Sequence, residues 1–500
     1  MRRTCGILLH ITSLPSPYGI GTLGQAAFDF IDFLVEAGQS CWQLLPTGPT
    51  GYGNSPYQVY STFAGNHNFI DLDLLVRQGL LTTSEVEATS WGQRPDQVDF
   101  DTLERERLPL FRLAYQRFRN DPPADFARFC EAEADWLEDY ALFMALRVRF
   151  KGKPWTEWPD PIRLRKPRSV TRYRQTQADE IGFHQFLQYQ FHIQWEAVQT
   201  YAHERGIQLV GDLPIYVSMD SADVWCHPEQ FQLDAALHPT CLAGCPPDQF
   251  SEDGQFWGNP IYDWNRMEQD GFQWWMSRIA AAGRLFDVIR IDHFRGLESY
   301  WAIPAEAETA KEGAWIKGPG KALIDAIRSQ FPHLQFIAED LGFLTKSVCD
   351  LLDYSGYPGM KVLEFGFDSG MGNDYLPHNY QSDNCVCYTG THDNTTLVQW
   401  CQETDAETLA FARDYLKLSP EADLADALLQ CGLTSQAGLF IAPLQDYLKL
   451  GAETRMNEPG TLKPENWRWR CTAGQLSPAL SKQLWTLAHE SERLPSQSDD

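Results

Sequence analysis

The chain has 500 residues and a mass of 57.0 kDa, which suits one large barrel with insertions or roughly two or three smaller units. With 43% hydrophobic and 22% charged residues it is not a low-complexity or disordered chain, and no apolar run reaches the roughly 20 residues of a membrane span. Its 41 basic and 67 acidic residues give a net charge of −26, which excludes nucleic acid and acidic membrane surfaces as expected partners.

Eight short runs of aliphatic and β-branched residues recur along the chain, and each ends in polar residues, Gly or Pro before a helical stretch. This alternation predicts parallel strands joined by crossover helices, and eight strands close a barrel. We therefore expect an α/β fold, a (β/α)8 TIM barrel with a large helical insertion after strand 2 and loop insertions at the C-terminal face. The predicted strands are Cys5–Ile11, Cys41–Leu45, Ile207–Gly211, Val288–Asp292, Phe336–Glu339, Lys361–Phe365, Cys385–Thr389 and Leu439–Pro443.

Apolar residues at helical spacing predict two helices that flank these strands. The first lies between Gly24 and Gly38, and the second ends at Gly206, directly before the third strand. Each presents one apolar face to the sheet. These faces consist of Phe28, Ile31, Leu34 and Val35 in the first helix and of Leu187, Phe191, Trp195 and Val198 in the second.

Two long segments interrupt the alternation of strands and helices. The gap of about 160 residues between the second and third strands far exceeds a βα connection, so residues 62–185 are expected to form a mostly helical inserted subdomain. Residues 218–275 are rich in Pro, Gly, Asp and aromatics, which predicts a loop-rich insertion over the cleft. The catalytic barrel is assigned to residues 1–490, and residues 491–500 to a frayed tail.

Three local patterns are typical of phosphate or nucleotide sites, but none has the required context. Gly19–Gly24 matches a dinucleotide fingerprint, yet residues 12–18 separate it from the preceding strand, whereas the fingerprint needs its glycines at the strand end. Gly318–Lys321 lacks the spacing of a phosphate-binding loop, and we interpret it as a surface turn. The basic run Arg163–Arg174 is interpreted as a solvated face.

The cysteines indicate free thiols and not a metal site. The chain has 12 of them, and the closest pairs, 241 with 245 and 385 with 387, lack a second pair or His at zinc spacing. The apolar stretch after the two N-terminal arginines is too short for a signal-peptide core. The expected location is therefore a reducing cytoplasm, with the plastid stroma as an alternative.

Acidic residues stand at or just after four of the predicted strands: Asp212, Asp292, Glu339 and Asp393. In a parallel barrel the C-terminal strand ends converge on one mouth and supply catalytic side chains. Helix capping explains any one such acid by itself, but four together favour an active site.

Retaining glycosyl transfer is a reaction that requires such a set of acids. It needs an ionised carboxylate and a protonated carboxyl about 5 to 5.5 Å apart, a separation that neighbouring strands supply. Arg290 and Asp292 are two apart on one strand and point the same way, so the guanidinium is expected to keep Asp292 ionised as the nucleophile. Glu339 follows an apolar run that would raise its pKa, as a general acid requires.

Several motifs in chain order resemble those of one enzyme family. They are Asp287–Gly296 (DVIRIDHFRG), Ala338–Gly342, Thr389–Thr395 (TGTHDNT), the run from His10 to Gly21, Gly53–Tyr57, Gly211–Tyr216 and Arg455–Thr461. Together they span almost the whole chain and resemble the core motifs of the 4-α-glucanotransferases called amylomaltase or disproportionating enzyme.

This resemblance implies a role for each candidate residue. Asp292 would be the nucleophile, Glu339 the acid/base and Asp393 the third carboxylate, with Arg290 and His392 assisting. The loop from Gly244 to Phe250 would cover the cleft. No metal or cofactor is implied, and the partners would be malto-oligosaccharide and α-1,4-glucan donors and acceptors. Further substrate contacts are implied for Ser55, Tyr57, Asp212, Asp248, Trp257 and Asn457.

Two other functions remain open at this stage. A retaining α-1,4-glucan hydrolase would share all three carboxylates, with water in place of the acceptor. A catalytically silent glucan-binding protein would keep the aromatics without needing the acids. Trp257 by itself fits core packing as well as a sugar platform, although Gly254 and Gly258 favour its placement in a loop.

Overall fold

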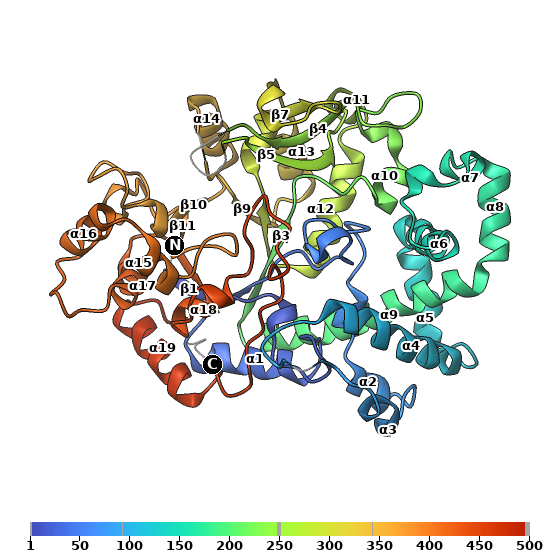
Figure 1. Ribbon diagram of the computed structural model, residues 1–500, viewed down its shortest axis with the longest axis horizontal. Helices are drawn as coiled ribbons and strands as arrows, with labels where there is room; N and C mark the ends of the chain where they lie inside the picture. Colours follow the sequence, from blue (N-terminus) through green and yellow to red (C-terminus); the bar gives the residue numbers. More distant parts are fainter. Residues whose placement is uncertain (1–2, 93, 248–251, 343, 496–500) are drawn as a thin grey trace.

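The structure is a computed structural model that describes residues 3–92, 94–247, 252–342 and 344–495. Eight of its strands form the barrel: β1 (Thr4–Leu8), β2 (Cys41–Gln43), β3 (Gln208–Leu213), β6 (Val288–Ile291), β9 (Gln335–Ala338), β10 (Gly359–Val362), β11 (Cys385–Tyr388) and β12 (Leu439–Pro443). They are parallel and close in the order β1-β12-β11-β10-β9-β6-β3-β2, with β2 paired to β1 (Figure 1). The predicted (β/α)8 fold class is confirmed.

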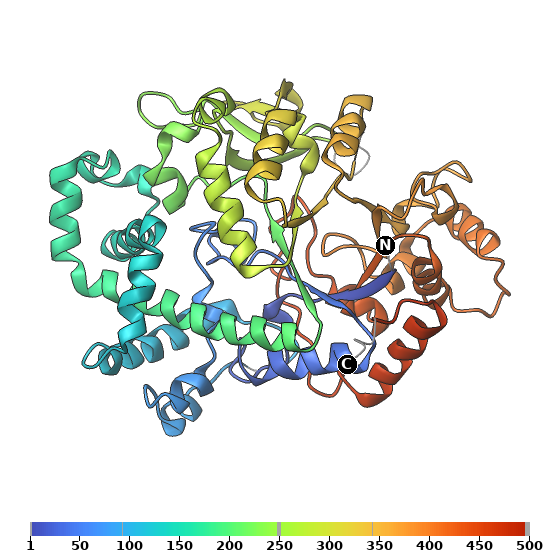
Figure 2. The same cartoon turned by 180° about the vertical axis from the view of Figure 1, so that it is seen from behind.

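Helices surround the barrel and build an arm at one side of it, on the right in Figure 1 and on the left in Figure 2. The arm consists of α4 to α9. The helices are α1 (Gln25–Glu36), α2 (Leu72–Arg77), α3 (Thr83–Glu87), α4 (Phe100–Phe118), α5 (Ala124–Ala132), α6 (Ala134–Arg149), α7 (Asp160–Arg163), α8 (Pro167–Thr176), α9 (Ala178–Glu204), α10 (Ala222–Cys226), α11 (Trp264–Gln269), α12 (Gln273–Leu285), α13 (Lys321–Gln330), α14 (Lys346–Ser355), α15 (Leu397–Glu403), α16 (Ala406–Tyr415), α17 (Leu424–Thr434), α18 (Leu444–Tyr447) and α19 (Pro478–Glu490). Among the described residues, no helix is both long and apolar enough to cross a membrane.

The alternation of strand and helix breaks between β10 and β11. Residues 363–384, all of them described, form turns and short 3-10 helices but no α helix. The strand predicted at Lys361–Phe365 therefore ends early, because β10 stops at Val362 and Leu363–Phe365 is a 3-10 turn. Leu363 is buried there, so an apolar run does not distinguish a strand from a buried turn.

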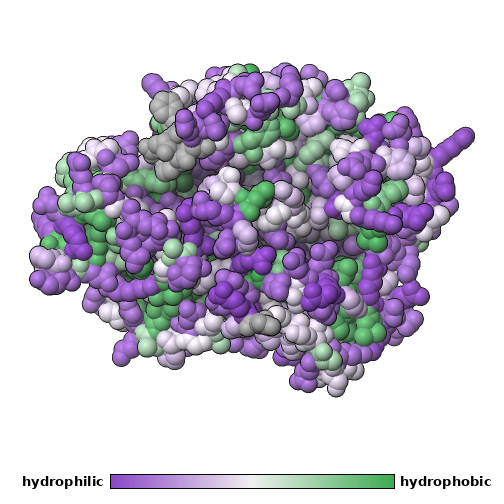
Figure 3. Space-filling model, viewed as in Figure 1, coloured by the Kyte–Doolittle hydropathy of each residue, from purple (hydrophilic) through white to green (hydrophobic). Residues whose placement is uncertain are grey.

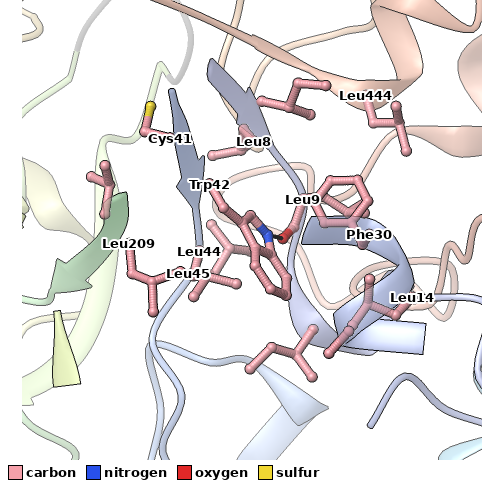
Figure 4. Packing of buried hydrophobic residues seen from close by; sticks show 14 of the residues in the cluster. Leu8, Leu9, Leu14, Phe30, Cys41, Trp42, Leu44, Leu45, Leu209 and Leu444 are labelled. Carbon is pink, nitrogen blue, oxygen red and sulfur yellow. Dashed lines mark hydrogen bonds between the residues drawn. The ribbon is translucent and has the colours of Figure 1, made fainter. Parts of the chain in front are cut away.

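The layer between the barrel and its helices is packed with large apolar side chains. Trp42 on β2 is fully buried, its ring lies 5.0 Å from that of Phe30 on α1, and its Nε1 donates to the carbonyl of Leu9 at 2.7 Å (Figure 4). This single hydrogen bond therefore satisfies both the buried indole N–H and the carbonyl directly after β1.

The two predicted helices form with nearly the predicted faces. In α1, Ile31 and Leu34 are fully buried, but Val35 is 44% exposed, so its assignment to the packed face is wrong. The buried stripe instead runs through Ala27, Phe30 and Phe33. All four apolar residues predicted for the second helix are buried in α9.

The segment that was expected to be loop-rich, residues 218–275, contains α10, α11, the start of α12 and two strands. These are β4 (Cys241–Cys245) and β5 (Gln255–Pro260), which join β7 (Ser299–Pro304) and β8 (Ala314–Lys317) in an antiparallel sheet of order β5-β4-β7-β8. This sheet lies at the top of Figure 1. This sheet could not be predicted from the sequence, because short strands rich in Gly and Pro lack clear alternation.

Two further expectations concern surface segments. No residue of α8, within the basic run, is buried, and Arg165 and Arg174 pair with Asp139, in agreement with a solvated face. The prediction of a frayed tail is wrong at Arg493. Its fully buried guanidinium donates to the carbonyls of Thr4 at 2.8 Å and Ala437 at 2.9 Å. Residues 496–500 lie outside the described part of the chain.

Candidate active site

The four strand-end acids come from three neighbouring barrel strands and one loop. Asp212 lies in β3, Asp292 directly follows β6 and Glu339 directly follows β9, and these strands are adjacent in the barrel. Asp393 lies in the loop after β11. Because parallel strands end at the same rim, these side chains gather at the C-terminal mouth of the barrel.

Strand register sets the relation between Asp292 and Glu339. Their preceding residues, Ile291 and Ala338, are partners across the β6–β9 pair. The backbone contact continues beyond the strands, because Glu339 N–H donates to the Ile291 carbonyl at 3.0 Å and Phe294 N–H donates to the Glu339 carbonyl at 2.9 Å. The two acids therefore stand at the same height on neighbouring strands.

One buried guanidinium serves two of the acids. Arg290 Nη1 donates to both carboxylate oxygens of Asp212 at 2.7 Å and to Asp292 Oδ1 at 3.2 Å. The Asp212 side chain is completely buried, whereas 25% of the Asp292 side chain is exposed. Asp212 is thus the buried counterion of Arg290, and the Asp292 side chain stays partly open to solvent at the barrel mouth.

Backbone N–H groups fix the carboxylate of Glu339. Oε2 accepts from His293 N–H at 2.6 Å, and Oε1 accepts from Leu341 N–H at 3.0 Å. His293 has φ +49°, a left-handed conformation that costs energy in a non-glycine residue. Because His293 directly follows Asp292, its N–H group links the backbone next to one acid with the carboxylate of the other.

Burial raises the pKa of both carboxyl groups. For Glu339 the rise is opposed by Arg290 and by the backbone N–H groups of Leu341 and His293, and its direction agrees with the sequence expectation. Burial raises the pKa of Asp292 well above its usual range, although Arg290 opposes this. Burial therefore works against the expectation that Arg290 keeps Asp292 ionised, and the same guanidinium also pairs with Asp212.

A second group of side chains faces these acids. Tyr57 O–H donates to Asp212 Oδ2 at 2.6 Å, and its oxygen lies 2.9 Å from His392 Nε2. The Tyr57 and His392 rings stack with centroids 5.3 Å apart. Burial lowers the pKa of His392, although Asp393 opposes the shift, so the imidazole is neutral near pH 7 and serves as a hydrogen-bonding group.

Asp393 is held beside His392 and remains accessible. Its Oδ1 accepts from Asn457 Nδ2 at 2.7 Å, and His392 Nε2 lies 3.4 Å from its Oδ2. The Asp393 side chain is 42% exposed, so it can reach a ligand in the cleft. Arg455 fixes the backbone of both residues, since it donates to the carbonyls of Asp393 at 2.7 Å and of Asn457 at 2.8 Å.

The remaining predicted binding residues take different positions. Trp257 lies in strand β5, not in the loop that its flanking glycines indicated, and its ring stands perpendicular to His293 at 4.9 Å. Ser55 Oγ accepts from the N–H of Tyr57 at 3.2 Å, so its hydroxyl positions Tyr57. Asp248 lies outside the described residues.

Sequence reasoning overlooked three residues of this site. His293 and Arg455 lie inside motifs that the sequence analysis identifies. Only the fold shows that the N–H of His293 binds Glu339 and that the guanidinium of Arg455 binds the backbone of Asp393. Trp467, whose ring lies 6.0 Å from those of both Tyr57 and His392, had no sequence signal. In the part of the chain that the structure describes, no three His, Cys, Asp or Glu side chains cluster as metal ligands.

Comparison with known proteins gives a consistent result. The sequence model of the 4-alpha-glucanotransferase family matches residues 9–476. The chain is 45% identical to the 4-alpha-glucanotransferase of Streptococcus pneumoniae over 489 residues, 97% of this chain and 96% of that protein. It is 46% identical to that of Thermus thermophilus over 503 residues, 98% of this chain and 99% of that protein.

A solved structure shows the same architecture. The amylomaltase from Streptococcus agalactiae, solved in complex with acarbose, superposes with a TM-score of 0.96 at 39% identity. The match covers 99% of this chain and 100% of the other.

Proposed function

The chain belongs to the 4-alpha-glucanotransferase family, and from this premise we propose that Asp292 and Glu339 catalyse the retaining transfer of α-1,4-glucan segments by double displacement. The observation that carries the proposal is the register of β6 and β9, which sets the two acids side by side at the barrel mouth. A strand spacing of about 4.8 Å matches the carboxyl separation of about 5 to 5.5 Å in retaining enzymes.

In the first step, Asp292 attacks the anomeric carbon of the donor while Glu339 protonates the departing glycosidic oxygen. The bond from carbon to that oxygen breaks, and a glycosyl ester forms on Asp292. Burial raises the pKa of both neighbouring carboxyls, which is consistent with a pair that holds one proton between its two members. Contact with Arg290 favours the charge on Asp292.

In the second step, Glu339 acts as a base. It takes the proton from the 4-hydroxyl of an acceptor glucan, whose oxygen displaces Asp292 from the anomeric carbon. The configuration inverted in the first step is inverted again, so the product retains the α linkage. Glu339 ends protonated and Asp292 ionised, and the site is ready for another turnover.

The surrounding residues hold the sugar that reacts. We assign Asp393, steadied by Asn457, to the sugar hydroxyls and to the positive charge that develops at the anomeric centre. Tyr57 and His392 border the same sugar, and Trp257 supplies an apolar ring next to His293.

The proposed substrates are malto-oligosaccharides and α-1,4-glucans, as both donor and acceptor. The related amylomaltase from Streptococcus agalactiae was solved with acarbose bound, which is consistent with a saccharide in this cleft. We also propose a reducing compartment, the cytoplasm or a plastid stroma, since all 12 cysteines are free thiols.

Incubation with maltotriose tests the reaction. Transfer yields glucose together with chains longer than maltotriose at a constant number of reducing ends, whereas a steady increase in reducing ends would show hydrolysis and overturn the proposal. Glu339→Gln tests the roles of the acids. With an α-maltosyl fluoride donor, whose leaving group needs no proton, this variant should accumulate a glycosyl adduct that peptide mass spectrometry maps to Asp292; an adduct on another residue would contradict the assignment.

A further inference from the structure

The antiparallel sheet outside the barrel carries a row of aromatic side chains that the proposed mechanism does not use. Across its four strands, Phe256 of β5 pairs with Gly244 of β4, Gly244 with Trp301 of β7, and Trp301 with Trp315 of β8. Residues directly opposite one another in antiparallel strands project from the same face. Phe256, Trp301 and Trp315 therefore form one line across one face of the sheet.

This face points away from the core. The residues that alternate with the row, Ala243, Tyr300 and Ala302, are buried in the core beneath the sheet. In contrast, Phe256 is 41% and Trp315 39% exposed, and Trp301 is half-buried. Apolar surface is visible in Figure 3 over the place where Figure 1 draws β4 and β5.

Neighbouring groups hold the row in a fixed geometry. Trp301 Nε1 donates to the Ala310 carbonyl at 2.8 Å, and its ring meets that of Trp315 edge-on at 5.2 Å. The guanidinium of Arg295 lies over the Trp315 ring at 3.8 Å. Rings held in this way lose little conformational freedom when a ligand stacks on them.

Two ion pairs lie beside the row. Lys311 Nζ lies 2.6 Å from Asp253 Oδ1, and Lys317 Nζ lies 3.3 Å from Glu298 Oε1. The side chains of the row itself carry no charge, although the chain as a whole has a net charge of −26. Such a surface suits a long, neutral ligand that presents apolar faces and hydroxyl groups, and an α-1,4-glucan has this character.

We propose that Phe256, Trp301 and Trp315 form a second binding surface for an α-1,4-glucan chain, outside the catalytic cleft. The proposal rests on the glucan-transfer activity of the family. Three strand spacings give the row a length of about 14 Å, enough for several sugar rings. The row is linked to the catalytic segment through Arg295, whose guanidinium lies over the Trp315 ring and which follows Asp292 by three residues. The surface therefore holds part of a long substrate while another part reacts.

Kinetics with a short and a long substrate test this proposal. For Trp315→Ala and Phe256→Ala we expect the KM for amylose to rise about threefold to tenfold, the loss expected for one aromatic contact. The kcat and KM for maltotriose should stay at wild-type values, which also shows that the variants fold. In native gels containing amylose, Asp292→Asn with Trp315→Ala should migrate faster than Asp292→Asn alone.

Trp485→Ala is the matched control. Trp485 is an exposed aromatic on α19, 42% accessible and stacked on His489, and its removal should leave the KM for amylose unchanged. An unchanged KM for amylose in Trp315→Ala and Phe256→Ala would overturn the proposal. Equal changes for maltotriose and amylose would overturn it as well, because Trp315 would then act through Arg295 on the catalytic segment. Wild-type protein that transfers no glucan would refute the proposed function instead.

Discussion

The contact between Asn457 and Asp393 offers a sharp test of the third carboxylate. Asn457→Ala removes the 2.7 Å hydrogen bond to Asp393 Oδ1. A hydrogen bond to a charged group contributes about 1.5–3 kcal/mol, and water replaces part of it because the Asp393 side chain is 42% exposed. We expect a loss of about 1–1.5 kcal/mol in transition-state stabilisation, which lowers kcat/KM about fivefold to tenfold.

Asn457→Asp at the same position turns the contact into a repulsion. Two unit charges about 4 Å apart at an effective dielectric constant of about 20 repel by about 4 kcal/mol, and exposure to solvent reduces this to about 2 kcal/mol. At pH 8 this variant should therefore lose roughly a further thirtyfold in kcat/KM relative to Asn457→Ala. Towards acid pH the two neighbouring carboxyl groups of this variant bind one proton between them, which restores a hydrogen bond and recovers part of the activity.

The assay is kcat/KM for maltotriose disproportionation from pH 5 to pH 8, expressed as the ratio of each variant to wild type. The ratio removes the titration of Asp292 and Glu339, which all three proteins share. The ratio should be flat for Asn457→Ala and should rise towards acid pH for Asn457→Asp. Equal and pH-independent ratios for the two variants would refute the reasoning that Asp393 acts as a charge steadied by Asn457.

Three further changes test the nucleophile, a buried acid and the packing around the barrel. Asp292→Asn should lower turnover by several orders of magnitude with circular dichroism unchanged, and activity above about a tenth of wild type would reject Asp292 as the nucleophile. Burial raises the pKa of Asp446 to about 6, so the folded state binds this proton more tightly than the unfolded chain with its pKa of about 3.9. Protonated Asp446 therefore stabilises the fold below about pH 4, and this stabilisation of about 2–3 kcal/mol is lost as the pH rises to about 6. In urea unfolding, the stability of Asp446→Asn relative to wild type should rise over this pH range. A stability difference that stays constant with pH would contradict this prediction. Trp42→Phe leaves the Leu9 carbonyl without its 2.7 Å donor and opens a cavity, so the free energy of unfolding should fall by about 2–4 kcal/mol, and a fall below about 0.5 kcal/mol would show that the layer repacks.

Most of the barrel could be predicted from the sequence because parallel barrel strands are buried on both faces and read as continuous aliphatic runs. The run at Val288–Ile291 is of this kind, and all four of its residues are buried. The same property makes strand ends hard to predict, since Leu363 is as buried in its 3-10 turn as Val362 is at the end of β10. The antiparallel sheet remained hidden because its strands pair across long separations, such as Gly244 with Trp301, which local patterns do not reveal.

Some residues of the candidate site could likewise be predicted from the sequence, and others could not. Asp212, Asp292 and Glu339 could be found from the sequence because a barrel gathers strand-end residues at one rim. The roles of His293 and Arg455 could not, because both act through backbone groups whose directions depend on the fold: a left-handed turn at His293 and the loop carbonyl of Asp393. A sequence records which side chains are available but not which backbone atoms face them.

The sharing of Arg290 bears on the proposed role of Asp292 as the nucleophile. If the guanidinium paired fully with Asp292, the carboxylate would be stable but weakly nucleophilic. The structure instead directs two 2.7 Å contacts to the buried Asp212 and leaves a single 3.2 Å contact for Asp292. Burial raises the pKa of both Asp292 and Glu339, and Arg290 opposes both rises, with a direct hydrogen bond to Asp292. In the proposed reaction, the fully buried Asp212 would therefore act through Arg290, by setting how much positive charge reaches Asp292, and not by the substrate contact implied from the sequence.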